Sequence, residues 1–174
     1  DMSSYRQDIL GDEAANIHFL FCNAHFLLGL SNACDKVIGA IQKEEEEEAG
    51  TGLGRDASNC FSRFKLSGES CASRFVRTAC DVLGPRGDQK NGCKKEWDAF
   101  CSETVGIKSF VTSFRMNRFN NYFQGAASLY HHRNDICSFL GDYRGELNLK
   151  LKSVLLDCQS PEIMALARAL GIIY

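Results

Sequence analysis

Several features that would place this chain in a known functional class are scarce or absent. Only two residues are proline, Pro85 and Pro161, so most of the chain is free to form helices. The longest apolar stretch, 19–30, is too short to cross a bilayer and contains Asn23 and His25. The chain opens on polar residues without an initiator Met. We therefore expect a fragment with no signal peptide and no membrane partner.

A charge excess and the common catalytic motifs are also missing. The net charge is −2, whereas a domain dedicated to nucleic acids usually carries a basic excess. Any contact with DNA would therefore come from a local patch. The sequence contains no glycine-rich phosphate loop, no H-E-x-x-H and no G-x-S-x-G. We expect no complete active site and no enzymatic activity of the chain alone.

What is present indicates one ordinary globular domain. With 174 residues, the chain can bury a core without help from metals or disulfides. Apolar residues make up 44% and charged residues 24%, a balance typical of globular proteins. We expect a single helical domain over residues 1–174.

Cysteine is unusually frequent. There are nine, an odd number with no C-x-x-C pair, and at least five fall on apolar faces of predicted helices. Disulfide scaffolds of secreted proteins are usually shorter and rich in loops. We therefore expect reduced, mostly buried thiols and a nuclear or cytoplasmic protein. The nine are Cys22, Cys34, Cys60, Cys71, Cys80, Cys93, Cys101, Cys137 and Cys158.

Helical periodicity dominates the sequence. It predicts an all-α fold, an irregular bundle of five to seven helices with at most one or two short strands. The longest helix is expected over 12–47, and its middle is apolar almost all round, which places it at the centre of the fold. It ends in Glu44 to Glu48, followed by Gly50 and Gly52. Adjacent negative charges repel, so we expect a mobile acidic and glycine-rich loop over about 44–57.

The remaining elements are shorter. Residues 60–66 are ambiguous between a strand and a helical turn, and 108–114 reads as an extended link. Ser160 before Pro161 and Glu162 is a strong helix start. Further helices are predicted over 67–83, 90–105 and 117–140, through Leu147 to Leu155, and from Ser160 onward.

Two local groups of histidines are candidate sites. The spacing of His18, Cys22 and His25 places them on one helix face, and imidazole and thiolate both suit zinc. A fourth ligand would have to come from elsewhere, such as His131 or His132, and the alternative is a core cysteine beside hydrogen-bonded histidines. His131 and His132, with Asp135 one turn on, could serve in acid–base chemistry. No nucleophile or oxyanion hole accompanies them, which favours partly exposed polar groups on a helix surface.

Basic residues gather in two stretches, 74–95 and 115–118. Such a surface could contact phosphates, and the alternative is ordinary solvated helix faces. The candidate nucleic-acid contacts are Arg74, Arg77, Lys94, Lys95, Arg115 and Arg118.

Two stretches resemble the hAT-type transposases and the cellular proteins derived from them. The C-x-x-H formed by Cys22 and His25, followed by the apolar run 26–30, resembles a helix of that family. The sequence RMNRFNNYFQGAASLYHH, residues 115–132, resembles an Arg-aromatic-Asn region of the same family. The aromatic residue there is commonly tryptophan and here is Phe119.

This resemblance implies that the chain is largely the helical domain inserted into an RNase H-like core. Such insertions help to position DNA ends and support oligomers. Cys22 and His25 would then be structural, and Arg118 and Phe119 would match the second region. The third catalytic acid cannot be placed and no zinc-finger module is present, which argues against strand cleavage by this fragment.

Three hypotheses about function therefore stand side by side. The first is a non-catalytic helical domain of a transposase-like protein that supports DNA positioning or assembly. The second is a protein–protein or oligomerisation bundle without a nucleic-acid role. The third is a metal-binding helical protein, with zinc held by His18, Cys22 and His25. Only the third requires a cofactor.

Overall fold

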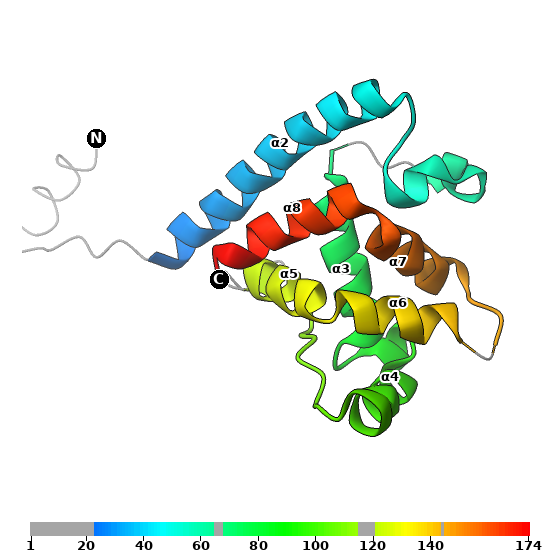
Figure 1. Ribbon diagram of the computed structural model, residues 1–174. Helices are drawn as coiled ribbons and strands as arrows, with labels where there is room; N and C mark the ends of the chain where they lie inside the picture. The colour runs from blue at the N-terminus through cyan, green and yellow to red at the C-terminus, as the bar shows by residue number, and fades with distance from the viewer. Residues whose placement is uncertain (1–22, 65–67, 115–120, 144) are drawn as a thin grey trace, which may run out of the picture.

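The computed structural model describes residues 23–64, 68–114, 121–143 and 145–174 (Figure 1). This part of the chain contains seven α-helices and no strand, so the all-α prediction is confirmed. Short 3₁₀ segments (η2, Gly54–Ala57; η3, Asn59–Phe64; η4, Gly87–Lys90) and a π-helical turn (η5, Cys101–Val105) connect them. The α-helices are α2 (Asn23–Ala49), α3 (Cys71–Leu83), α4 (Lys94–Phe100), α5 (Asn121–His131), α6 (Arg133–Gly141), α7 (Leu149–Gln159) and α8 (Pro161–Ile172).

Helix α3 forms the centre of the fold. Eleven of its thirteen residues are buried, and it contacts α5, α7 and α8 (Figure 1). The helix begins after Ser70, whose side chain accepts a hydrogen bond from the Ser73 amide at 3.2 Å. The sequence placed this start at Ser67, which lies outside the described residues. The predicted end at Leu83 is confirmed.

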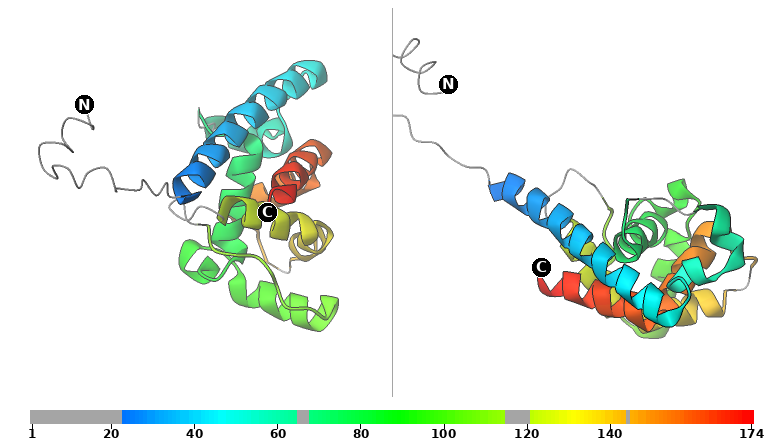
Figure 2. Two further views of the ribbon diagram at one scale, coloured as in Figure 1. Left: turned by 90° about the vertical axis from the view of Figure 1, so that its left-hand side faces the viewer. Right: turned by 90° about the horizontal axis from the view of Figure 1, so that it is seen from above.

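Helix α2 lies along the outside of the bundle (Figure 2). In 29–49 Ile38 is the one buried side chain, so this part of α2 does not lie at the centre of the fold. Most of the apolar stretch 19–30, on which the prediction of a central position depends, lies outside the described side chains. The inner face of α2 is partly polar because it meets the first turn of α3. Asp35 accepts the amide of Ser70 at 3.2 Å, and Gln42 accepts the amide of Cys71 at 2.7 Å.

The segment 44–57 also differs from the predicted mobile loop. Helix α2 continues through the glutamates to Ala49, because glutamate has a high helix propensity and Gln42 donates a hydrogen bond to Glu46 at 2.8 Å. Farther on, η2 is fastened to α7. The Arg55 guanidinium lies 2.6 Å from the fully buried Asp157 carboxylate, which also accepts the Arg55 amide at 2.9 Å. Burial raises the pKa of Asp157, and Arg55 opposes this shift.

The helix predicted over 117–140 is divided in two. Helix α5 ends at His131, His132 forms a turn, and α6 begins at Arg133. The His132 side chain is completely buried: its Nε2 accepts the Phe110 amide at 3.2 Å, and its Nδ1 lies 3.0 Å from Asp135 Oδ2. These two contacts, which a periodicity pattern does not reveal, anchor the irregular segment before α5 at the break.

The other short elements agree in part with the sequence. The ambiguous 60–66 segment is 3₁₀-helical as far as Phe64. The helix in the predicted range 90–105 is shorter than expected: α4 begins only at Lys94 and ends at Phe100, and a π-helical turn follows it. Ser160 caps α8 as predicted, with Pro161 in its first turn.

The eight cysteines in the described residues all carry free thiols. This agrees with the prediction of reduced cysteines. Burial raises the pKa of several of these thiols, which keeps them protonated and unreactive at neutral pH. No described helix combines the length and the apolar character that a bilayer crossing needs. Of the eight described cysteines, five are buried: Cys71, Cys80, Cys93, Cys101 and Cys158.

Candidate functional site

Two of the predicted phosphate contacts form ion pairs within the protein. Arg74 is only 5% exposed, and its guanidinium lies 2.6 Å from the Asp56 carboxylate. Arg77 is partly exposed and pairs with Glu69, also at 2.6 Å. The charge of Arg74 is therefore neutralised in the interior and is not presented to a phosphate.

The other basic candidates are divided. Lys94 pairs with Asp98 one turn along α4. Lys95 is exposed and forms no ion pair with a described residue; its backbone amide donates a hydrogen bond to Asp88 at 3.3 Å. Arg115 and Arg118 lie outside the described residues. Of the six candidate contacts, the described residues thus retain one without an ion pair, Lys95.

The candidate zinc ligands cannot be placed. His18 and Cys22 lie outside the described residues, and of His25 only the backbone, in α2, is described. Within the part of the chain that is described, no group of three or more potential ligands could hold a metal ion.

The histidine pair has a structural arrangement. Both ring nitrogens of His132 have partners within the protein, and the side chain has no exposed surface. Since Nε2 accepts a backbone amide, Nδ1 carries the proton and donates to Asp135. His131 is exposed, and its ring lies edge-on to that of His132 at 4.9 Å. A substrate therefore has no access to His132.

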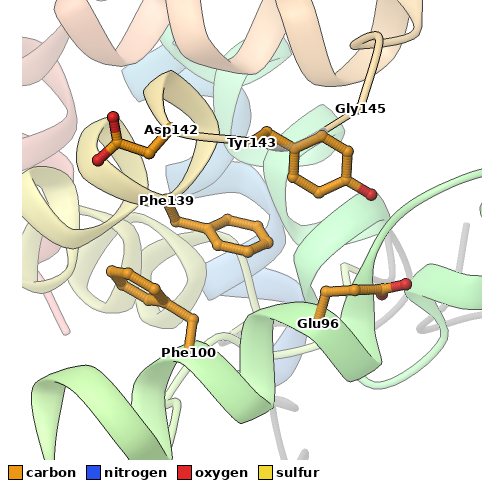
Figure 3. Close-up of a pocket in the computed structure, with 6 residues that line it drawn as sticks. All are labelled: Glu96, Phe100, Phe139, Asp142, Tyr143 and Gly145. Carbon is orange, nitrogen blue, oxygen red and sulfur yellow. The ribbon is translucent and has the colours of Figure 1, made fainter.

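The strongest candidate site is a pocket between α4 and the end of α6 (Figure 3). Its volume is about 510 Å³, within the usual range of ligand pockets, and it opens broadly to solvent. None of the residues that line this pocket was predicted to form a site. The lining residues are Glu96, Phe100, Phe139, Asp142, Tyr143 and Gly145.

Trp97 fixes the floor of this pocket. Its side chain is completely buried, and its indole Nε1 donates a hydrogen bond to Ser109 at 2.7 Å. The indole ring stacks on Phe100 at 5.9 Å and packs against Phe139 at 5.4 Å. Such aromatic contacts hold both phenyl rings in place behind the pocket surface.

Three aromatic rings form the apolar wall. The centroids of Phe100 and Phe139 lie 5.3 Å apart, and those of Phe139 and Tyr143 lie 5.7 Å apart. Phe139 projects between the other two rings (Figure 3). Phe100 and Tyr143 are half-buried, so parts of their rings remain accessible to a ligand.

Two carboxylates form the polar rim. Glu96 and Asp142 are exposed and extend on opposite sides of the Phe139 ring (Figure 3). Neither forms an ion pair with any described residue, and Arg144, beside Tyr143, lies outside that set. Partial burial, with a smaller contribution from the negative charge of Glu96, raises the pKa of Tyr143, so its phenol stays protonated at neutral pH.

This combination of groups is suited to a cation. An ammonium or guanidinium group is attracted to the face of an aromatic ring, by about 0.5–2 kcal/mol. Glu96 and Asp142 add charge attraction at the rim. The same surface offers no cationic group among its described lining residues to hold an anion.

Sequence reasoning missed this site because its parts are distant in the chain. Phe100 lies within the helix predicted over 90–105, and Asp142 and Tyr143 lie between two predicted helices, so no local pattern marked them as a site. The one local signal is the spacing of Phe139 and Tyr143, which brings their rings together at the end of α6.

Comparison of the chain with protein-family models, with curated proteins and with solved structures finds no match. The resemblance to hAT-type transposases therefore stays a prediction, and function must be inferred from the site itself.

Proposed function

We propose that this protein is a non-enzymatic helical interaction module that binds a cationic side chain of a protein partner. The observation that carries this proposal is the pocket in which Phe100, Phe139 and Tyr143 face an acidic rim. It develops the protein–protein hypothesis that the sequence left open.

The shape of the pocket favours a side chain over a small free ligand. The pocket is wide open, whereas small-molecule sites usually enclose most of the ligand surface. A lysine or arginine projecting from a partner would lay its aliphatic stem on the accessible parts of Phe100 and Tyr143 and its charge near Glu96. The rest of the partner would supply the remaining contact area.

The proposal of a non-enzymatic role rests on the environment of the reactive groups. His132 is enclosed with both nitrogens bonded, and the buried thiols of Cys71, Cys80 and Cys93 have pKa values raised to about 12. These residues are therefore poor candidates for acid–base or nucleophilic chemistry at neutral pH.

Trp97 provides a direct test, since it is the only tryptophan and lies behind the pocket. Two peptides that differ only at the central residue, lysine in one and norleucine in the other, are titrated against the chain while tryptophan emission is recorded. A contribution of about 1.4 kcal/mol from the charge corresponds to roughly tenfold tighter binding of the lysine peptide. Glu96→Gln should reduce this preference, and Lys95→Gln, an exposed neighbour outside the lining, should not.

Equal binding of the two peptides would remove the proposal, because it would show that charge is not recognised. A short DNA duplex serves as a third titrant under the same conditions. Salt-sensitive binding of DNA without binding of the lysine peptide would instead support the hypothesis of DNA positioning.

A further inference from the structure

A second hollow, lined by none of the aromatic-pocket residues, follows helix α8. Its volume is about 390 Å³. One edge is a stripe on α8 at intervals of four, three and four residues, the spacing of one helix face. The stripe consists of Pro161, Ala165, Arg168 and Ile172, all exposed.

The opposite edge of the hollow adds a second positive charge. Arg133 stacks over the Tyr130 ring at 4.4 Å, and Arg168 approaches the same ring at 5.9 Å. Neither guanidinium forms an ion pair with a described carboxylate, and no acidic residue is among those lining the hollow. The α8 hollow is thus aliphatic along α8 and positively charged around Tyr130.

The same chain carries a surface of complementary character on α2. Val37 is 60% exposed and Ile41 is 38% exposed, while the inner face of α2 is marked by the buried Ile38. Farther along the exposed side lie two glutamates without a described ion pair. These residues, the α2 stripe, are Val37, Ile41, Glu44 and Glu48, again at intervals of four, three and four.

We propose that the α2 stripe of one copy docks in the α8 hollow of a second copy. With the two helices running in the same direction, the equal spacing sets Ile41 against Ala165 and Glu44 beside Arg168. The opposite direction would place Ile41 over Arg168 and bury a charge against an aliphatic side chain, which is unfavourable. The parallel register thus pairs Val37 and Ile41 with aliphatic residues and Glu44 with Arg168, and it leaves Glu48 beside Ile172 at the end of the hollow. It matches charge and apolar surface better than the opposite direction does.

The expected association is modest in strength. A single contact of three helical turns buries an area at the small end of the range for stable interfaces. A two-fold dimer would contain this contact twice and so bury twice the area. Because Glu44 is exposed, the attraction between Glu44 and Arg168 weakens as salt is added. This inference does not depend on the aromatic pocket, so either can fail alone.

Sedimentation velocity of the full chain over a wide concentration range tests the proposal. The wild type should show a weight-average mass that rises with concentration. Arg168→Glu and Glu44→Lys should each weaken association by roughly tenfold, and the double variant should restore it. Arg86→Glu is the matched control, because Arg86 is exposed and lines neither hollow.

Monomeric behaviour at every concentration would overturn the proposal. So would association that neither charge reversal weakens, or a double variant weaker than both single ones. Val37→Asp provides an independent check that introduces a charge without touching either arginine, and it should also abolish association. Circular dichroism of each variant confirms that these exposed substitutions leave the helices intact.

Discussion

Replacing Asp157 by asparagine tests the buried ion pair that fastens η2 to α7. The Asp157 carboxylate is completely buried and lies 2.8 Å from Arg55 Nε and 2.6 Å from Arg55 Nη2. Asparagine keeps an oxygen that can accept the Arg55 amide but leaves the buried guanidinium without a counter-charge. Removing one partner of a buried ion pair costs about 3–5 kcal/mol. That is a large part of the free energy of unfolding of a typical protein, which is about 5–15 kcal/mol.

Urea denaturation followed by circular dichroism measures this loss. The matched control is Asp98→Asn, because Asp98 is 48% exposed and pairs with Lys94 on the helix surface. We expect that control to cost less than about 1 kcal/mol. Replacing Arg55 and Asp157 together by apolar residues should recover much of the loss. A cost below about 1 kcal/mol for Asp157→Asn would refute the role assigned to this ion pair.

Three further results are expected. Cys137 should be alkylated by iodoacetamide faster at neutral pH than the buried thiols, since its interaction with Cys158 lowers its pKa. Peptide mapping should find little label on the buried thiols of raised pKa, Cys71, Cys80, Cys93 and Cys101. Ser160→Ala removes the side chain that accepts the Ile163 amide and should cost about 1 kcal/mol in thermal unfolding. His132→Leu leaves the Phe110 amide without its acceptor and should cost about 1–3 kcal/mol, measured in the same way.

Local signals in the sequence predicted the fold class and several helix ends correctly. Ser160 before Pro161 marks the start of α8, because a hydroxyl cap and a proline satisfy the first turn without outside help. Gly84 before Pro85 likewise stops α3 at Leu83. These features depend only on neighbouring residues, so periodicity and capping residues are sufficient to find them.

The arrangement of the helices depends on contacts between distant residues and was predicted less well. The burial of α3 depends on tertiary partners for its polar side chains, such as Asp56 for Arg74. The anchoring of η2 depends on Asp157, which follows Arg55 by 102 positions. Gly54, with φ +52°, also packs against Asp157, where a Cβ would lie 2.8 Å from its Oδ1. No local pattern contains this information.

The candidate site shows the same limit. Phe100 and Phe139 meet only after α4 and α6 pack on Trp97, and each alone reads as an ordinary core residue. Arg74, a predicted phosphate contact, shows the same dependence, since its burial in an ion pair with Asp56 joins residues 18 positions apart. Charge and aromaticity indicate a site only when their tertiary neighbours are known.

The most direct test of cation binding is an NMR measurement of contacts between the lysine peptide and the protein. If the ammonium group enters the aromatic pocket, intermolecular nuclear Overhauser effects should link the lysine ε-methylene protons with the ring protons of Phe139 and Tyr143. The lysine signals should also shift upfield, because they lie over ring faces. A peptide that binds without any contact to these two rings would contradict the proposed function.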